Sequence, residues 1–240
     1  MNIKEDKVLR VSVCMAIFNG ERFVMDQIES VLSQLSEKDE LIISDDGSID
    51  NTVTIIRSIN DPRIRLFQSQ GSGVVLNFEN ALNQVTGDVI ILCDQDDIWL
   101  PGRLKIAVNS LYNHDLVMVN YQVVDSNLNP VESNSPEISL SFFRTFVKNG
   151  YLGCCMAFRS SILVSILPFP KGIAMHDWWI ALLCLLKFDV FISDQNGILY
   201  RRHNSNASST GEVSQLTLRM KITIRIHLLL ALVKRSIGLK

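Results

Sequence analysis

Short apolar runs and longer helix-period segments alternate along the first half of the chain. A short apolar run bounded by turn-forming residues predicts a buried strand, whereas apolar residues recurring every three or four positions predict an amphipathic helix. The predicted strands cover residues 11–18, 40–44, 64–68, 88–93 and 116–124. The predicted helices lie between them, over 23–35, up to Ile59, over 74–85 and from Pro101 to about Asn113. This repetition predicts an α/β fold with a mostly parallel central sheet, right-handed crossovers and flanking helices.

The second half of the chain has weaker patterns. Residues 125–141 are rich in Asn, Ser and Pro and predict a long loop, which in a compact domain is usually functional or disordered. A strand over 153–158, a helix over 178–186 and a strand over 190–193 are predicted after it. From Leu216 onward the apolar residues fit both a period of two and one helical face, and the length of the segment favours a helix.

Three carboxylates directly follow the fourth predicted strand. They belong to Asp94, Asp96 and Asp97, at the edge where open α/β sheets bind ligands. Carboxylates this close repel one another and favour a hard divalent cation such as Mg²⁺ or Mn²⁺, which substrate phosphates would also ligate. The run therefore indicates a nucleotide diphosphate site. Its structural alternative is an acidic loop that caps the helix opened by Pro101.

A second acidic pair, Asp45 and Asp46, follows the second predicted strand and would face the same crevice. One acidic group could hydrogen-bond a base or ribose while the other holds a metal on the diphosphate. The sequence Asp-Asp-Gly-Ser is also common as a plain turn. The segment 71–73, Gly-Ser-Gly, lacks the third glycine of a dinucleotide fingerprint and is interpreted as a loop.

Two clusters in the second half carry further chemistry. Residues 176–179, His-Asp-Trp-Trp, place an ionisable pair ahead of two aromatics that could form the floor of a sugar-sized pocket. The alternative is a helix-capping aspartate with core tryptophans behind it. Residues 200–203, Tyr-Arg-Arg-His, could face phosphate, or could form a solvated turn.

Composition narrows the class of protein. The 240 residues include 23 Lys and Arg against 25 Asp and Glu, which excludes the basic footprint of a general nucleic-acid binder. Residues 1–10 lack the apolar stretch of a signal peptide and no run of 18 apolar residues occurs, so we expect neither secretion by that route nor a membrane span. Five cysteines without Cys-x-x-Cys spacing predict reduced core residues of a cytosolic protein. They are Cys14, Cys93, Cys154, Cys155 and Cys184.

In order and spacing these motifs resemble the inverting nucleotide-sugar glycosyltransferases of family 2, which have the GT-A fold. The resemblance covers roughly residues 8–206. The variant Asp-Gln-Asp-Asp-Ile-Trp is similar to bacterial transferases that build O-antigen or capsular polysaccharide, rhamnosyltransferases among them. We therefore expect a GT-A domain over 8–212, followed by a basic and apolar helical segment over 213–240.

The resemblance also implies roles for individual residues. Asp46 would contact the nucleotide base or ribose, Asp94 and Asp96 would form the Asp-x-Asp element, and Asp177 would be the catalytic base. The implied donor-binding residues are Ala16, Asn19, Asp45, Asp46, Asp94, Asp96, Arg201 and His203. The implied metal ligands are Asp96 and His203, and the implied acceptor-binding residues are His176, Trp178 and Trp179.

Two departures from the family pattern affect the donor site. Leu76 stands where related sequences often carry Lys or Arg, which removes one diphosphate contact. Ile17 and Phe18 replace the usual Thr-Tyr pair, while the acidic framework is intact.

These features predict a metal-dependent glycosyltransferase. It would move a hexose or deoxyhexose, rhamnose being one candidate, from a nucleotide diphosphate sugar to a lipid-linked saccharide at the inner membrane face. A nucleotidyltransferase would also explain the acidic turns but leaves residues 176–179 without a role. A non-catalytic nucleotide-sugar-binding partner is the third interpretation, and Leu76 favours it.

The end of the chain suggests where such an enzyme would act. Residues 213–240 combine an apolar stretch with basic residues and no acidic one. Such a segment can lie on an anionic membrane surface, pack on the protein's own core or form an oligomer contact. The basic residues are Arg219, Lys221, Arg225, Lys234, Arg235 and Lys240.

Overall fold

A single mixed sheet organises the chain, in a computed structural model that describes residues 9–132, 137–203, 206 and 217–238. Its eight strands have the order β3-β2-β1-β4-β7-β6-β8-β5. The strands are β1 (Val11–Ile17), β2 (Glu40–Asp45), β3 (Ile64–Gln68), β4 (Val89–Asp94), β5 (Ile98–Trp99), β6 (Leu116–Val124), β7 (Met156–Arg159) and β8 (Val190–Arg201). The first four are parallel, β7 is antiparallel to β4 and β6, β8 is parallel to β6, and β5 is antiparallel to β8. The predicted α/β class is confirmed.

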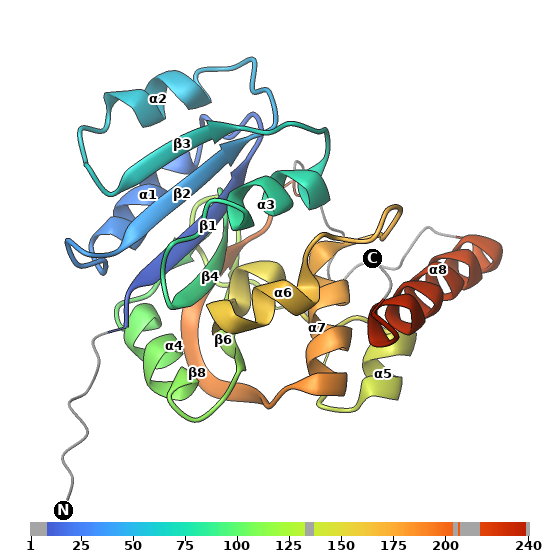
Figure 1. The fold of residues 1–240 in the computed structure, drawn as a ribbon. Coiled ribbons are helices and arrows are strands. Elements are labelled where there is room, and N and C mark those ends of the chain that lie inside the picture. Colours follow the sequence, from blue (N-terminus) through green and yellow to red (C-terminus); the bar gives the residue numbers. More distant parts are fainter. Residues whose placement is uncertain (1–8, 133–136, 204–205, 207–216, 239–240) are drawn as a thin grey trace, which may run out of the picture.

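Helices cover both faces of this sheet (Figure 1). They are α1 (Val24–Leu32), α2 (Thr52–Ser58), α3 (Val74–Leu82), α4 (Arg103–Leu111), α5 (Phe142–Val147), α6 (Leu163–Ile166), α7 (His176–Lys187) and α8 (Leu218–Ser236). The chain passes from β1 to β2 in one direction along the sheet and from β3 to β4 in the other. Right-handed crossovers therefore place α1 and α3 on opposite faces. α4 adjoins the segment just after α1, where Leu104 donates to the Gln34 amide, and α7 adjoins α3.

The register of the parallel strands aligns their acidic carboxyl ends. Asp94 of β4 lies opposite Ala16 of β1, and Asp45 of β2 lies opposite Ile17. The sequence prediction that both acidic groups end at one edge of the sheet is thereby confirmed. Of these strands, β1, β2 and β4 are almost entirely buried, which explains why they are largely apolar runs in the sequence.

The second half differs from the prediction in several elements. Residues Gly153–Cys155 form a 3₁₀ turn, so the strand predicted over 153–158 begins only at Met156. β8 continues from the predicted 190–193 to Arg201, across polar residues that carry no strand pattern. The short elements β5, α5 and α6 were not predicted. Each is six residues or fewer, too short to show a period in the sequence.

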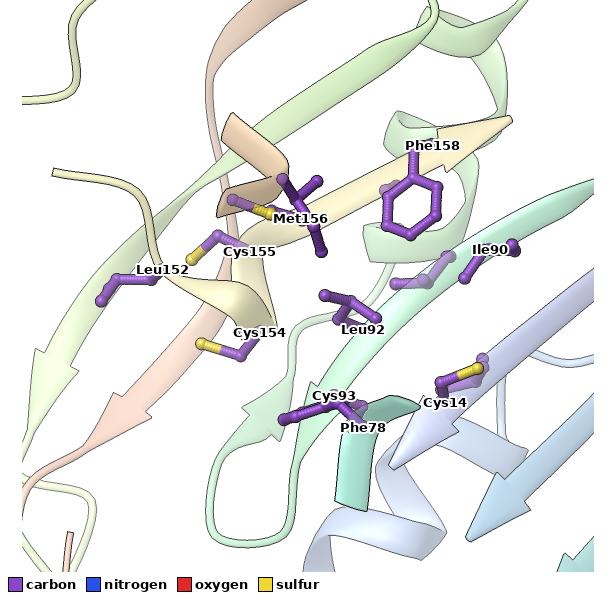
Figure 2. Packing of buried hydrophobic residues seen from close by; sticks show 14 of the residues in the cluster. Cys14, Phe78, Ile90, Leu92, Cys93, Leu152, Cys154, Cys155, Met156 and Phe158 are labelled. Carbon is purple, nitrogen blue, oxygen red and sulfur yellow. The ribbon is translucent and has the colours of Figure 1, made fainter. Parts of the chain in front are cut away.

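The core is continuous from the sheet into α3 and α7. Figure 2 shows buried residues of this core, among them Phe78 of α3, Cys93 of β4 and Met156 of β7, with Cys154 from the 3₁₀ turn before β7. All five cysteines are buried and free, as predicted for core residues.

The last helix, α8, lies at the periphery beside α5 (Figure 1). It buries Leu228 and Leu232, and Arg235 donates hydrogen bonds to the carbonyls of Ser165 and Leu167 at 2.8 Å each. The segment is a helix, as its length suggested. Among the described residues, no helix combines the length and the apolar character that crossing a membrane requires.

Candidate active site

An acidic pocket lies at the carboxyl edge of the parallel strands. This cavity of about 440 Å³ is named here for four carboxylates that line it, those of Asp46, Asp94, Asp96 and Asp177. Ala16 and His176 line it as well, whereas no described lining residue is Lys or Arg. An anionic ligand in this pocket would meet unbalanced negative charge unless a cation came with it.

The turn after β4 forms one side of the acidic pocket. The Asp96 carboxylate lies 2.8 Å from Nε2 of His203 and accepts a hydrogen bond of 3.3 Å from the Asn206 amide. The Asp97 carboxylate accepts the backbone N–H of Arg201 at 2.9 Å. These contacts join residues more than 100 positions apart because β5, just after the turn, pairs with β8.

The carboxylates of this turn destabilise each other's charge. Burial, together with the nearby charges of Asp96 and Asp177, raises the pKa of Asp94 to about 7. Burial and the charges of Asp96 and Asp94 raise the pKa of Asp97 well above its usual value. A bound cation would reverse both effects by favouring the ionised forms.

The donor atoms in the pocket fit a hard divalent cation. Asp94 and Asp96 offer carboxylate oxygens in the pocket, and His203, which contacts Asp96 from a neighbouring cavity, offers an imidazole. Together these groups suit Mg²⁺ or Mn²⁺ when substrate phosphates complete the coordination. A second group, Asp94, Asp97 and Cys154, has ligand atoms within 4.8 Å of one another. Its thiol suits softer metals, and both Asp97 and Cys154 are fully buried. The first set is therefore the better site for a metal shared with phosphate.

The start of α7 forms the opposite side. The Asp177 carboxylate accepts hydrogen bonds from the backbone N–H of Trp178 and, at 3.2 Å, from the Asn149 amide. Burial raises its pKa to about 7 in spite of these hydrogen bonds. A carboxylate that takes up and releases a proton near neutral pH is suited to general base catalysis.

The turn after β2 forms the third part of the pocket. Asp46 lines the cavity, and its carboxylate accepts the backbone N–H of Gly73 at 2.7 Å. Asp45 instead turns into its own loop, where it accepts the hydroxyl of Ser48 at 2.6 Å. Of this predicted pair, only Asp46 is placed to reach a ligand in the pocket.

The structure places several predicted site residues outside the acidic pocket. Trp178 and Trp179 are core residues whose indole N–H groups donate to the carbonyls of Thr145 and Ile166, so they do not form the expected pocket floor. Helical geometry turns them inward from α7. Arg201 is also buried, with its guanidinium 4.5 Å from the Phe23 ring centroid and its backbone N–H held by Asp97, so it does not face a phosphate in the pocket.

Asn19 and His203 line a neighbouring cavity of about 690 Å³, together with Arg22 and Arg202. Gln95 and Phe18 line both cavities and separate them. The Gln95 amide donates to the Phe18 carbonyl at 3.0 Å and accepts the Phe18 N–H at 2.9 Å. His203 thus reaches the acidic turn from this side.

Four residues of the site were missed in the sequence. Gln95 separates the two cavities, and Gly153 lines the acidic pocket beside His176. Asn149 donates a hydrogen bond to Asp177, and Asn206 donates one to Asp96. Gln95 lies inside the acidic motif and could have been considered from its position alone. The other three act through contacts that only the folded chain creates.

The fold and the site together define an α/β protein with an acidic ligand pocket at the carboxyl edge of its parallel strands, and comparison with known proteins identifies its family. Residues 12–167 match the family model described as glycosyl transferase family 2. The chain therefore belongs to glycosyl transferase family 2.

Named relatives and solved structures agree with this assignment. UDP-Glc:alpha-D-GlcNAc-diphosphoundecaprenol beta-1,3-glucosyltransferase WfgD of Escherichia coli is 27% identical, over 67% of this chain and 64% of its own length. The dTDP-rhamnosyl transferase RfbG of Shigella flexneri is 26% identical, over 80% of this chain and 72% of its own length. S. aureus TarS 1-349 in complex with UDP-GlcNAc has the same fold, with a TM-score of 0.68 at 20% identity, over 92% of this chain and 71% of that one. The chain thus spans less than two thirds of WfgD.

Proposed function

We propose that this chain is an inverting glycosyltransferase that uses a nucleotide diphosphate sugar and a divalent cation. One observation carries the proposal. A single cavity holds cation-ligating carboxylates on one side, at Asp94 and Asp96, and on the other a buried carboxylate, Asp177, that titrates near neutral pH. A site that only bound a nucleotide sugar would have no need for the buried carboxylate of Asp177.

The residues divide the work as follows. Asp94, Asp96 and His203 would hold Mg²⁺ or Mn²⁺, which when bound neutralises the charge that develops on the leaving diphosphate. Asp46 would bind the base or ribose. Asp177 accepts the proton of the acceptor hydroxyl while the hydroxyl oxygen forms a bond to the anomeric carbon of the donor sugar. The bond from that carbon to the diphosphate oxygen breaks on the opposite face, so the configuration inverts.

The relatives suggest the substrates. RfbG is named for transfer of a rhamnosyl group from dTDP, and WfgD for transfer of glucose to a diphosphoundecaprenol-linked sugar. We infer a hexose or deoxyhexose donor, with rhamnose a candidate, and a lipid-linked saccharide acceptor. The pathway would be that of a bacterial surface polysaccharide such as O-antigen or capsule.

An enzyme with a lipid-linked acceptor would act at the cytoplasmic face of the inner membrane, and α8 supports this placement. The helix exposes apolar side chains that include Ile226, Leu229 and Leu230. Arg219 and Lys221 lie in its first turn, and the described part of α8 has no acidic residue. Arg225 and Arg235 donate instead to backbone carbonyls, so fewer cations are available to lipid headgroups than the sequence suggested. We infer that residues 8–212 are the catalytic domain and 213–240 the surface-binding segment.

Liposome co-sedimentation tests the membrane placement. The intact chain is expected to bind anionic vesicles at low salt and to be released partly at raised salt, whereas a variant with Ser at Ile226, Leu229 and Leu230 should stay in solution. These side chains are about half exposed, so their replacement leaves the core intact. Equal binding by both proteins would contradict the role assigned to α8.

A panel of nucleotide sugars tests the activity. With Mn²⁺ and a saccharide diphospholipid acceptor, one donor should yield free nucleotide diphosphate. The new linkage should have the anomeric configuration opposite to that of the donor sugar. The same donor should raise the melting temperature of the chain, because a ligand that binds only the folded state stabilises it. If a donor raises the melting temperature but no acceptor leads to release of nucleotide diphosphate, the chain is instead a non-catalytic nucleotide-sugar-binding partner.

A further inference from the structure

The outer face of α5 is apolar where a surface helix is normally polar. The inner face packs on α7, and the Thr145 carbonyl accepts the indole N–H of Trp178 at 2.8 Å. On the outer face, four positions apart, Phe143 is 78% exposed and Val147 is 62% exposed. A helix that buries one face usually presents polar side chains on the other, and exposed apolar patches mark interaction sites. The outer face of α5 is therefore suited to bind an apolar partner.

A groove of about 510 Å³ lies on this face and has basic residues beside its apolar ones. We call it the α5 groove, and it is lined by Glu137, Ser139, Phe143, Arg144, Val147 and Lys148. Arg144 and Lys148 are exposed, and neither forms an ion pair with a described residue. Two cations against one carboxylate leave net positive charge next to an apolar surface. An anion that carries an apolar chain matches both properties of the groove.

The last helix, α8, extends the apolar surface of the α5 groove. The Arg225 guanidinium donates to the Val147 carbonyl at the end of α5, and the two helices lie side by side (Figure 1). Ile222 and Leu229 lie one turn before and one turn after Arg225, and each is about half exposed. An apolar chain that leaves the groove can therefore continue along α8, the segment proposed above to lie on the membrane.

The basic end of the α5 groove adjoins the residue that holds the proposed catalytic base. Lys148 is followed directly by Asn149, whose amide donates to the Asp177 carboxylate at 3.2 Å. In a saccharide linked to lipid through diphosphate, the diphosphate lies between the apolar chain and the sugar. The order of apolar groove, basic residues and Asp177 matches this order of lipid, diphosphate and sugar. An ordinary phospholipid would fit the groove but would not explain its position beside Asp177.

We propose that the α5 groove binds the lipid diphosphate part of the acceptor. Arg144 and Lys148 contact the phosphates, and Phe143 and Val147 contact the first part of the apolar chain. The cations donate charge-assisted hydrogen bonds to phosphate, and the apolar side chains remove the lipid from water. This inference rests on the proposed function, because it takes the acceptor to be a lipid-linked saccharide.

Farnesyl diphosphate tests the groove apart from catalysis, because it has an apolar chain and a diphosphate but no sugar. A chelator in the titration prevents a metal from drawing the diphosphate into the acidic pocket. The natural chain should bind this probe, and the double variant Arg144→Glu, Lys148→Glu should bind it at least about tenfold more weakly. Phe143→Ser should weaken binding about threefold to tenfold. Pyrophosphate and farnesol, each with one half of the probe, should bind far more weakly than farnesyl diphosphate.

Matched controls separate the groove from net charge and from surface apolarity in general. The double variant Arg57→Glu, Lys105→Glu makes the same charge change on exposed residues of α2 and α4. Val164→Ser removes an apolar side chain that is 80% exposed, like that of Phe143. Both controls should bind farnesyl diphosphate within about twofold of the natural chain, because distant surface charges are screened by salt. All variants should keep the melting temperature of the natural chain, since the replaced side chains are exposed.

Kinetics assign the groove to the acceptor. With a saccharide diphospholipid as acceptor, Arg144→Glu, Lys148→Glu should raise KM for that acceptor about tenfold or more and leave the dissociation constant of the nucleotide sugar unchanged. With a water-soluble saccharide that has no lipid diphosphate, the natural chain and the double variant should transfer sugar at equal rates. A loss with both acceptors would mean that the substitutions disturb the acidic pocket, and it would overturn the proposal.

The outcomes separate this proposal from the proposed function. If the natural chain releases no nucleotide diphosphate with any donor, the proposed function fails, whatever the groove binds. If the natural chain is active but the double variant keeps its affinity for farnesyl diphosphate and its acceptor KM within about twofold, only the role of the groove is wrong.

Two further results would overturn the role of the groove. Equal affinity of the natural chain for pyrophosphate and farnesyl diphosphate would make it a phosphate site without a lipid. Weaker binding of the double variant to anionic vesicles, with unchanged acceptor KM, would assign α5 to the bilayer surface instead. Should the double variant fail to fold, Phe143→Ser decides by the same measurements of farnesyl diphosphate affinity and acceptor KM.

Discussion

The turn after β4 and the start of α7 face each other across one pocket, yet they hold their carboxylates in different ways. In the turn, Asp96 is held by His203 and Asn206, residues that the β5–β8 pairing brings from the other end of the sheet. At the start of α7, Asp177 is held by the next residue's backbone and by Asn149. The turn crowds three carboxylates together, and the helix start isolates one.

This difference separates two kinds of chemistry. Mutual repulsion in the turn is relieved by a cation, so Asp94 and Asp96 are suited to hold a metal. Asp177 is buried in the first turn of α7, where its hydrogen bonds offset only part of the cost of burying its charge. Its pKa is therefore about 7. Substitutions on the two sides should therefore impair different steps, proton transfer at Asp177 and metal binding at Asp96.

The largest effect is expected from Asp177→Asn. Loss of the proposed general base should lower kcat by about 10²–10⁴-fold while the dissociation constant of the nucleotide sugar stays within about twofold. The natural chain should lose kcat/KM as pH falls below about 7, because Asp177 becomes protonated. Single-turnover kinetics and calorimetric titration of the donor measure the two quantities. A variant that loses donor affinity and keeps kcat would place Asp177 in the nucleotide site.

Asp96→Asn should abolish the response to metal. We expect a fall of about 10²–10³-fold in kcat/KM, the range for losing electrostatic stabilisation of a developing charge. Raised Mn²⁺ should not restore it. Asn can still accept from His203 and Asn206, so the free energy of unfolding should change by less than about 1 kcal/mol. Near-normal turnover at saturating Mn²⁺ would show that the metal lies elsewhere, the buried group with Cys154 being the alternative.

The sequence predicted one side of the pocket better than the other. The strands that end at Asp45 and Asp94 are buried on both faces, so their apolar runs give both the fold class and the position of the acidic edge. The acidic run that begins at Asp94 is predicted at that edge because it directly follows such a strand. These features depend on local sequence alone.

The remainder of the site depends on contacts that local sequence does not encode. Asp96 meets His203 only because β8 continues through Asn196 and Gly197, where no strand pattern exists. Trp178 and Trp179 were expected in the pocket because aromatics often floor sugar sites, but the orientation of α7 buries both. Gly153, which packs against the ring of His176, lies in a 3₁₀ turn that the pattern did not predict.

The two sides also differ in how stability depends on pH. The pKa of Asp177 is about 7 in the folded chain and near its ordinary value when unfolded, so between these values only the folded chain keeps the proton. Stability from this group is therefore full at low pH and is lost as pH rises toward 7. Carboxyl groups with a lowered pKa, such as Glu40 at about 2, add little to the change of unfolding free energy with pH above pH 5. They are largely ionised there in both the folded and the unfolded state.

We therefore expect Asp177→Asn to be more stable than the natural chain at pH 8, by on the order of 3 kcal/mol, with a smaller advantage at pH 5. Urea unfolding at the two pH values, with a chelator present, measures the difference. Asp94 also titrates near pH 7, so the variant should keep part of the slope. An advantage that is equal at both pH values would mean that Asp177 has an ordinary pKa in the folded chain.

The smallest effect is expected from Asn149→Ala, which tests how the isolated carboxylate is held. The Asn149 amide donates to Asp177 at 3.2 Å and stabilises its ionised form, so its removal should raise the pKa of Asp177 and move the acid limb of kcat/KM to higher pH. A hydrogen bond contributes about 1 kcal/mol, which corresponds to about a fivefold loss at pH 6 and little loss at pH 8.5. Asn51→Ala is the matched control, because Asn51 donates to the exposed Glu21 outside the pocket. Should Asn149→Ala lower kcat/KM equally at every pH, Asn149 would orient Asp177 without stabilising its charge, and the contrast between the two sides would rest on burial alone.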